Sequence, residues 1–109
     1  MAYNTNQIDI GQSGGTYLDD VGVYVAPTGK VIAAINIVTA DTSFTTLTPA
    51  NDVGTHYPGT TVVATAAGNG VNAEAIIEAD NFPAGQWIYG RWSACTLDDG
   101  AAFLYFADA

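Results

Sequence analysis

Short apolar segments separated by turn-forming residues run along the chain from Thr16 onward. Within most of these segments apolar and polar residues alternate, and Val, Ile, Thr, Tyr, Phe and Trp are frequent. Alternation with a period of two, together with β-branched and aromatic residues, is typical of β-strands. The pattern predicts strands at 21–25, 30–39, 42–48, 61–67, 71–77, 87–97 and 101–106.

Glycine, proline, asparagine and aspartate mark the turns between these segments. Gly68-Asn69-Gly70 and Asp98-Asp99-Gly100 each stand between two predicted strands, where such sequences favour tight hairpin turns. Pro27 and Gly29 predict a β-turn, and Pro83-Ala84-Gly85 predicts a corner. We therefore expect two hairpins, one around each tight turn.

The segment 30–39 is apolar on both faces. Strict alternation places Val31, Ala33, Ile35 and Ile37 on one face, while Ile32, Ala34 and Val38 lie on the other. A strand of this kind is central in a sandwich, or one of its faces meets a partner. Ile35 and Ile37 are therefore structural or interface candidates.

Residues 73–79 have two competing interpretations. Their alanine and glutamate content favours a helix. Alternation of Val71, Ala73, Ala75 and Ile77 with polar residues favours a strand, which is the preferred interpretation.

Taken together, these segments predict an all-β fold, an antiparallel β-sandwich or small barrel of seven to eight short strands. Residues 1–15 are polar and rich in glycine near their end, and we interpret them as a flexible N-terminal arm. Residues 16–109 form a single β domain.

The chain carries a formal net charge of −9, from two Lys or Arg and eleven Asp or Glu residues in 109. Nucleic acids and anionic membranes are bound by clusters of cations. Lys30 and Arg91 are the only two, so we expect neither nucleic acid nor membrane as a partner. No apolar run reaches the roughly 20 residues of a membrane-spanning helix, and the start lacks the pattern of a signal peptide.

Few residues could carry out catalysis. Cys95 is the single cysteine, which excludes an intrachain disulfide and suits folding in a reducing cytosol. His56 is the single histidine, and a Cys–His pair would require the fold to bring the two together. The carboxylate pairs Asp19-Asp20 and Asp98-Asp99 lie at turns, where Asp caps backbone amides. We therefore expect a protein that is not an enzyme.

Metal binding has equally little support. One cysteine and one histidine cannot build a structural zinc site, and we expect neither a metal nor a cofactor. Calcium remains the open alternative, because Ca²⁺ takes oxygen ligands from irregular loops. The loop carboxylates are those of Asp19, Asp20, Asp41, Asp52, Asp98 and Asp99.

The segment 87–92 holds the remaining candidates. Trp92 shares a strand face with Ile88 and Ala94, so we expect it in the core, whereas Trp87 stands beside the predicted corner and could lie in the core or at an interface. Arg91 is the only arginine and lies within an apolar strand. A buried arginine needs a carboxylate or carbonyl partner, and we interpret Arg91 as part of a structural or intersubunit salt bridge.

Residues 82–92 read Phe-Pro-Ala-Gly-Gln-Trp-Ile-Tyr-Gly-Arg-Trp, and an apolar Ala-Phe-Leu-Tyr-Phe follows at 102–106. This segment resembles the C-terminal part of small acidic virion proteins of tailed phages, in which a Pro-Ala-Gly corner leads into Ile-Tyr-Gly-Arg and a final hairpin. Within that group the chain is most similar to capsid decoration, or cement, proteins. The specific match is confined to residues 82–92.

The resemblance implies a structural protein that binds the major capsid protein on the outer surface of the assembled phage head and stabilises it. It would be made in the host cytoplasm, be located on the capsid surface of the virion and form a homotrimer. The alternative is a fibre or tail-associated domain that binds a host-surface glycan through Trp87, Tyr57 and the loop 49–59. The structural or interface candidates are Arg91, Trp87, Trp92, Tyr89, Ile35 and Ile37.

Overall fold

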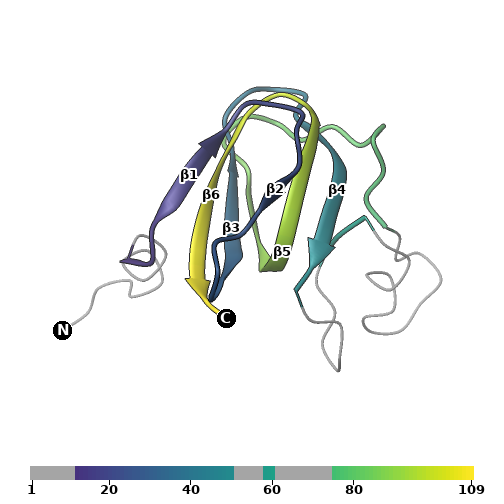
Figure 1. Cartoon of the computed structure of the whole chain (residues 1–109). Coiled ribbons are helices and arrows are strands. Elements are labelled where there is room, and N and C mark those ends of the chain that lie inside the picture. The colour runs from purple at the N-terminus through teal and green to yellow at the C-terminus, as the bar shows by residue number, and fades with distance from the viewer. Residues whose placement is uncertain (1–11, 51–57, 61–74) are drawn as a thin grey trace.

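The computed structural model describes residues 12–50, 58–60 and 75–109 (Figure 1). Its elements are six β-strands that pair antiparallel, in a sheet that curls into a half-barrel around the core (Figure 1). The predicted all-β antiparallel class is therefore confirmed. The strands are β1 (Gly15–Leu18), β2 (Tyr24–Val25), β3 (Lys30–Ile37), β4 (Ser43–Pro49), β5 (Trp87–Asp99) and β6 (Ala102–Asp108).

The order of strands across the sheet is β1-β6-β3-β5-β2, and β4 also pairs with β5. β3 is thus central, lying between β6 and β5, as its apolar residues on both faces predicted. β5 pairs with three strands. Its residues from Trp87 to Trp92 pair with β3, those from Trp92 to Asp99 pair with β4, and Ala94 and Cys95 also pair with β2.

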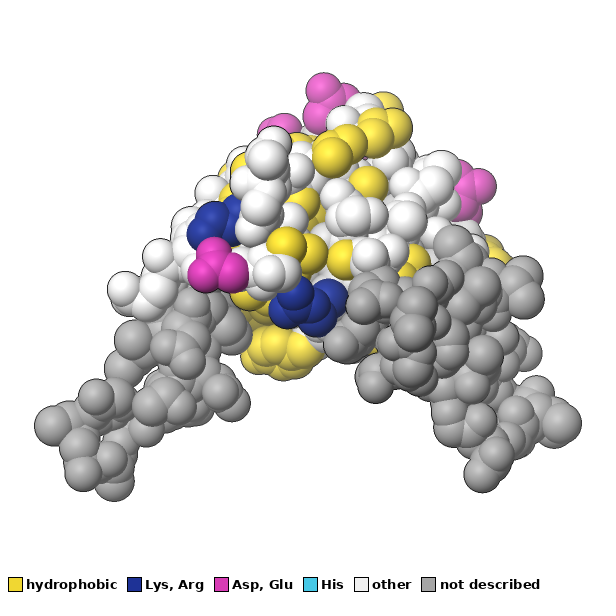
Figure 2. Space-filling model, turned by 60° about the horizontal axis from the view of Figure 1, so that its bottom comes forward, with side chains coloured by type: hydrophobic (Ala, Val, Ile, Leu, Met, Phe, Trp, Pro, Cys, Tyr) yellow, Lys and Arg dark blue, Asp and Glu magenta, His cyan; other side chains and the backbone are white. Residues whose placement is uncertain are grey.

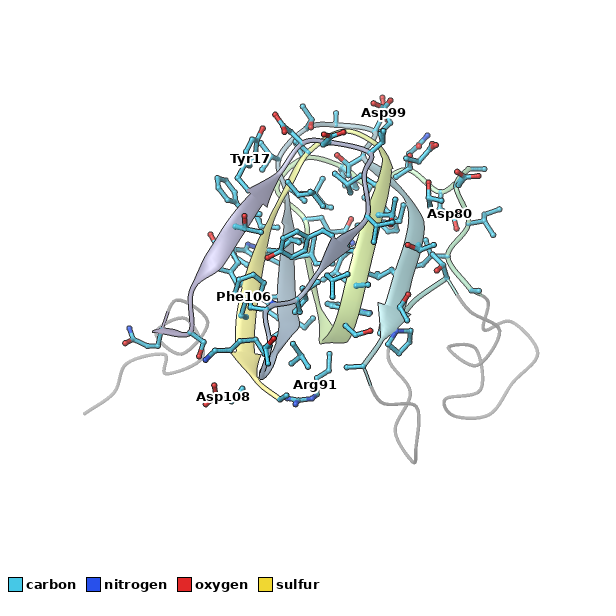
Figure 3. All side chains as sticks on the ribbon, in the orientation of Figure 1. Tyr17, Asp80, Arg91, Asp99, Phe106 and Asp108 are labelled. Atoms are coloured by element: carbon cyan, nitrogen blue, oxygen red, sulfur yellow. The ribbon has the colours of Figure 1, made fainter. Side chains whose placement is uncertain are left out.

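Figure 3 shows Arg91 at the bottom of the molecule and Asp99 at the top, so the second half of β5 runs upward. The first half runs downward, because Trp87 stands opposite Asn36, whose neighbour Ile37 pairs with Ala102 at the top, and Trp92 stands opposite Ile32. β5 therefore bends near Arg91.

Trp92 occupies this bend and has no exposed surface. It pairs with Ile32 of β3 and with Pro49 of β4, and its Nε1 donates a hydrogen bond to the carbonyl of Pro58 at 2.5 Å. A Cβ on Gly90 would approach the Trp92 indole to 2.7 Å. The missing side chain at Gly90 thus leaves room for the indole to fold back against its own strand.

A β-bulge in β3 changes which of its residues face the core. The register shifts between Ile32 and Ala34, so strict alternation breaks at Ala33. As a result Ile32 joins Ile35 and Ile37 in the core cluster, and the predicted facial partners of the two isoleucines were wrong. The core also contains Leu18, Phe44, Leu47, Ile88, Trp92, Cys95, Leu97, Ala102, Leu104 and Phe106.

Three of the predicted turn sequences lie in the described part of the chain. At Pro83-Ala84-Gly85 the amide of Gln86 donates to the carbonyl of Pro83 at 3.3 Å and Gly85 has a φ of 88°, which confirms the predicted corner. The amide of Lys30 donates to the carbonyl of Pro27 at 2.9 Å, and Gly29 has a φ of 80°, which confirms the predicted turn. Gly100 also takes a positive φ, but β6 pairs with β1 and β3 rather than with β5. The hairpin prediction for 87–106 was therefore wrong, because the bend in β5 leads its second half away from β6.

Several strand boundaries differ from the prediction. The segment 21–25 forms a strand only at Tyr24–Val25, and 42–48 becomes Ser43–Pro49. Residues 75–79 are neither strand nor helix, because the amide of Asp80 closes a turn onto the carbonyl of Ile77 at 2.9 Å. The strand prediction for 71–77 is thus wrong at its described end. The predicted strand 61–67 and the turn at 68–70 lie outside the described residues.

Gly15, the last residue of the predicted arm, is the first residue of β1 and pairs with Tyr105. The amide of Phe106 donates to the carbonyl of Gly14 at 3.0 Å, so β6 also contacts the residue before β1. The first eleven residues of the predicted arm lie outside the described residues.

Candidate functional site

Three of the candidates from the sequence lie in the interior. Trp92 and Ile35 have no exposed surface and Ile37 is 1% exposed. All three belong to the core cluster of this chain. Their side chains therefore pack the inner face of the half-barrel and are not available to a partner in the folded chain.

Trp87 and Tyr89 point to the opposite face of β5, on either side of the buried Ile88. Their ring centroids lie 6.0 Å apart, with planes inclined by 9°. In the register with β3 they stand opposite Asn36 and Ala34, respectively. These are small or polar residues, and they leave the two rings uncovered.

Three further aromatic rings extend this exposed pair across the sheet. Trp87 approaches Tyr105 of β6, with centroids 5.6 Å apart, and Tyr105 lies 6.4 Å from Phe103 on the same strand. Phe103 contacts Tyr17 of β1, with centroids 5.0 Å apart. We refer to Tyr17, Trp87, Tyr89, Phe103 and Tyr105 as the aromatic strip.

The register explains why the rings gather on the outer face. Along β6, Ala102, Leu104 and Phe106 face the core, so Phe103 and Tyr105 face outward. Pairing with β1 puts Tyr17 opposite Phe103, the arrangement in which cross-strand aromatic pairs stabilise a sheet. Figure 3 shows Tyr17 on the outside of the half-barrel, whereas Phe106 lies inside it.

The aromatic strip is exposed but carries no charge. Tyr17, Trp87, Tyr89 and Phe103 expose between 40% and 58% of their surface. The neighbouring outward positions are Gly15, Ala34 and Asn36, so within the described strands no Asp, Glu, Lys or Arg stands between the rings. The described carboxylates lie instead in turns and at strand ends, at Asp19, Asp20, Asp41, Glu78, Asp80, Asp98, Asp99 and Asp108.

Figure 2 shows both cations of the chain on the face that it turns forward, which is the bottom of the molecule in Figure 1, where the C-terminus lies. Lys30 Nζ and Asp108 Oδ1 form an ion pair of 2.6 Å, and the hydrogen bond and charge of Lys30 hold the pKa of Asp108 below its usual value. Arg91 is half-buried, and its Nη2 donates to the backbone carbonyl of Asp108 at 3.1 Å. Within the described residues, Arg91 thus contacts a carbonyl and forms no ion pair.

The described residues contain no group of three or more His, Cys, Asp or Glu side chains placed to hold a metal ion. Asp52, one of the carboxylates considered for calcium, lies outside the described part of the chain, as do His56 and Tyr57. Cys95 is buried in the core, and this burial raises the pKa of its thiol to about 12. The thiolate, which is the nucleophilic form, is therefore scarce at neutral pH.

We expect the Cys95 thiol of the folded protein to be unreactive toward a disulfide reagent such as dithionitrobenzoate at pH 8, because it is both buried and protonated. Full reaction should appear only after unfolding in urea. The absorbance of the released nitrothiobenzoate anion measures the reaction in both the folded and the unfolded protein. Rapid labelling of the folded protein would contradict the burial of Cys95.

Sequence reasoning missed Tyr17, Phe103 and Tyr105 as members of the aromatic strip. The pattern along 102–106 could have indicated exposed rings, because aromatic residues occupy both faces of that predicted strand and one face must point outward. No local pattern could join them to Trp87, because the contact crosses β3 and depends on the order of the strands.

A scan against protein-family models, a search of curated proteins and a search of solved structures each find no match. Among the described residues no helix is long and apolar enough to cross a membrane.

Proposed function

We propose that this chain is a non-enzymatic structural protein of a phage virion, which binds the outer surface of the assembled head and stabilises it. The observation that carries the proposal is the exposed, uncharged aromatic strip. Aromatic residues are enriched and charged residues are depleted at the centres of protein interfaces. Exposed apolar patches on soluble proteins commonly mark interaction sites.

Two residues belong both to the segment that carries the resemblance and to the aromatic strip. Trp87 and Tyr89 belong to the segment 82–92 that resembles phage decoration proteins, and they supply two rings of the aromatic strip. In the proposal the partner is the major capsid protein, the location is the capsid surface and the assembly is a homotrimer. These three points rest on the resemblance.

Stabilisation of the head would follow from mass action. A protein that binds the assembled shell but not its separated subunits lowers the free energy of the assembled state. The rings stand on paired β-strands, so little side-chain and backbone freedom remains to be lost on binding. Several copies acting on one shell add avidity to each contact.

The direct test is co-sedimentation with heads of the phage that the proposal implies, assembled from its major capsid protein without this chain. We expect the wild-type protein to sediment with the heads and to raise their melting temperature. The double variant Trp87→Ser/Tyr89→Ser should bind at least about tenfold more weakly, since interface Trp and Tyr residues dominate binding energy.

A matched control is Val23→Ser/Val25→Ser. Both valines are exposed, and neither belongs to the strands that carry the aromatic strip, since Val25 lies in β2 and Val23 precedes it. This variant should bind heads like the wild type. Wild-type protein that leaves heads unbound, or equal loss of binding in both variants, would refute the proposed function.

One observation favours the glycan-binding alternative. Trp87 presents 41% of its surface beside two tyrosines whose hydroxyl groups can form hydrogen bonds. Such rings can stack on apolar faces of sugars. Quenching or a blue shift of tryptophan fluorescence on a panel of neutral glycans, with no binding to heads, would favour this function.

A further inference from the structure

We propose that Asp99 is a site of spontaneous modification, at which aspartate converts to isoaspartate through a cyclic succinimide. The reaction needs no enzyme, and water is its only co-reactant. It concerns the chain itself, so the inference goes beyond the proposed function and does not depend on it. Its consequence is a slow, covalent loss of stability as the folded protein ages.

The reaction joins the side chain of an aspartate to the backbone that follows it. The amide nitrogen of Gly100 attacks the carboxyl carbon of Asp99, and the amide proton and the carboxyl hydroxyl leave as water. Hydrolysis of the ring then breaks one of the two bonds that the nitrogen makes to carbonyl carbons. Cleavage at the side-chain carbonyl restores aspartate, whereas cleavage at the backbone carbonyl leaves isoaspartate. The water lost in the first step is regained in the second, so the mass of the chain does not change.

Three observations distinguish Asp99 from the other aspartates. It is the only aspartate in the sequence that is followed by glycine, whose missing side chain leaves the attacking nitrogen open. It is exposed in the connection between β5 and β6, at the top of the molecule in Figure 3. The amide of Gly100 donates a hydrogen bond to Oδ1 of Asp99 at 2.8 Å, so the carboxyl group is folded back onto the nitrogen that attacks it. Intramolecular reactions are fast when the reacting atoms are held about 3–3.5 Å apart.

Asp20 provides an internal comparison. It is also exposed, and the amide of Val21 donates to its Oδ1 at 2.7 Å, so its carboxyl group is folded back in the same way. The residue that follows is valine, however, whose branched Cβ crowds the nitrogen and restricts its approach. We therefore expect Asp20 to react at least about tenfold more slowly than Asp99.

Isoaspartate would disturb the contacts beneath this turn. It adds one carbon atom to the main chain between residues 99 and 100, at the position where Asp99 pairs with Ser43 of β4. The turn has no spare room on its inner side, because a Cβ on Gly100 would overlap Oγ1 of the buried Thr42. That hydroxyl accepts a hydrogen bond from the amide of Ala101 at 3.3 Å, which a displaced turn would break. Aged protein should therefore unfold at a lower urea concentration than fresh protein.

The experiment is incubation of the full folded chain at neutral pH and body temperature, sampled over several weeks. Each sample is unfolded and cut with trypsin after Lys30 and Arg91, which gives the peptides 1–30, 31–91 and 92–109. Peptide 92–109 contains no asparagine, so deamidation cannot contribute to a second chromatographic peak of this peptide. We expect such a peak to grow at unchanged mass, and electron-transfer fragmentation to place the isomer at Asp99.

Two variants at neighbouring exposed positions form a matched pair. Asp99→Ser removes the carboxyl group that closes the ring, so its peptide 92–109 should stay a single peak and its urea midpoint should not change on incubation. Asp98→Ser keeps Asp99 and Gly100, so it should form the isomer as fast as the wild type. Comparing each incubated variant with its own fresh sample removes any effect of the substitution itself on stability.

A folded chain that forms no isomer at Asp99 would overturn the inference, and the same chain held in guanidinium chloride would show whether the turn protects the residue. Isomerisation of Asp20 at the rate of Asp99 would also overturn it, because the absent side chain at Gly100 would then have no effect. An isomer at Asp99 with an unchanged urea midpoint would refute the predicted loss of stability. None of these results depends on binding to heads.

Discussion

Replacing Trp92 with alanine is expected to lower the free energy of unfolding by about 3–5 kcal/mol. Trp92 has no exposed surface, sits at the bend of β5 and bonds the carbonyl of Pro58. Alanine would leave a cavity between the halves of β5 and remove a hydrogen-bond donor. Domains of this size are stable by only about 5–15 kcal/mol, so the variant should lose much of its stability.

Urea unfolding followed by far-ultraviolet circular dichroism measures this loss. The matched control is Trp87→Ala, which removes the same side chain at an exposed position of the same strand. We expect it to cost about 1 kcal/mol, the value of its contacts with neighbouring rings. Equal losses for the two tryptophans would contradict the central place of Trp92 in the core.

Replacing Gly100 with alanine should lower the free energy of unfolding more than the same substitution at the other glycines of the described turns. Gly100 has a φ of 91°, which strains any L-residue. A Cβ there would also overlap Oγ1 of the buried Thr42. That hydroxyl donates to the carbonyl of Thr39 at 2.7 Å and accepts from the amide of Ala101 at 3.3 Å, so moving it disturbs two hydrogen bonds.

The variant Gly29→Ala separates the two causes of destabilisation, which are backbone strain and steric overlap with a neighbouring side chain. Gly29 has a similar φ of 80°, but a Cβ there would meet nothing within 4 Å. We expect Gly29→Ala to cost about 1–2 kcal/mol from backbone strain. Gly100→Ala should cost about 2 kcal/mol more, because its Cβ overlaps Thr42. Similar urea midpoints for the two variants would show that Thr42 adapts without loss.

The link between fold and function runs through the order of strands. The aromatic strip exists because β6 and β5 flank β3, so Tyr105 and Trp87 meet across the small outward residues of that strand. The proposed binding to the head uses this outer face, while the inner face holds Trp92 and the core. Substitution of Trp92 should therefore lower stability, whereas substitution of Trp87 should mainly weaken the proposed binding.

The sequence by itself determined the class of structure and the positions of two described turns, at Pro27–Gly29 and at Pro83–Gly85. Alternation and β-branched residues predicted the strands, because a strand with one buried face needs apolar residues with a period of two. Pro27 and Gly29 predicted their turn, because their backbone preferences are local. The two cations, the single cysteine and the single histidine narrowed the candidate chemistry, because these numbers do not depend on how the chain folds.

Only the tertiary structure decided how the strands pair. The turn at Asp98-Asp99-Gly100 predicted a hairpin, but the bend at Trp92 leads β5 to β4 and leaves β6 to β3 and β1. The bulge at Ala33 placed Ile32 in the core with Ile35. Pairing and bulges depend on contacts between residues far apart in the chain, which local periodicity does not encode. For the same reason the aromatic strip, assembled from β1, β5 and β6, appears only in the folded chain.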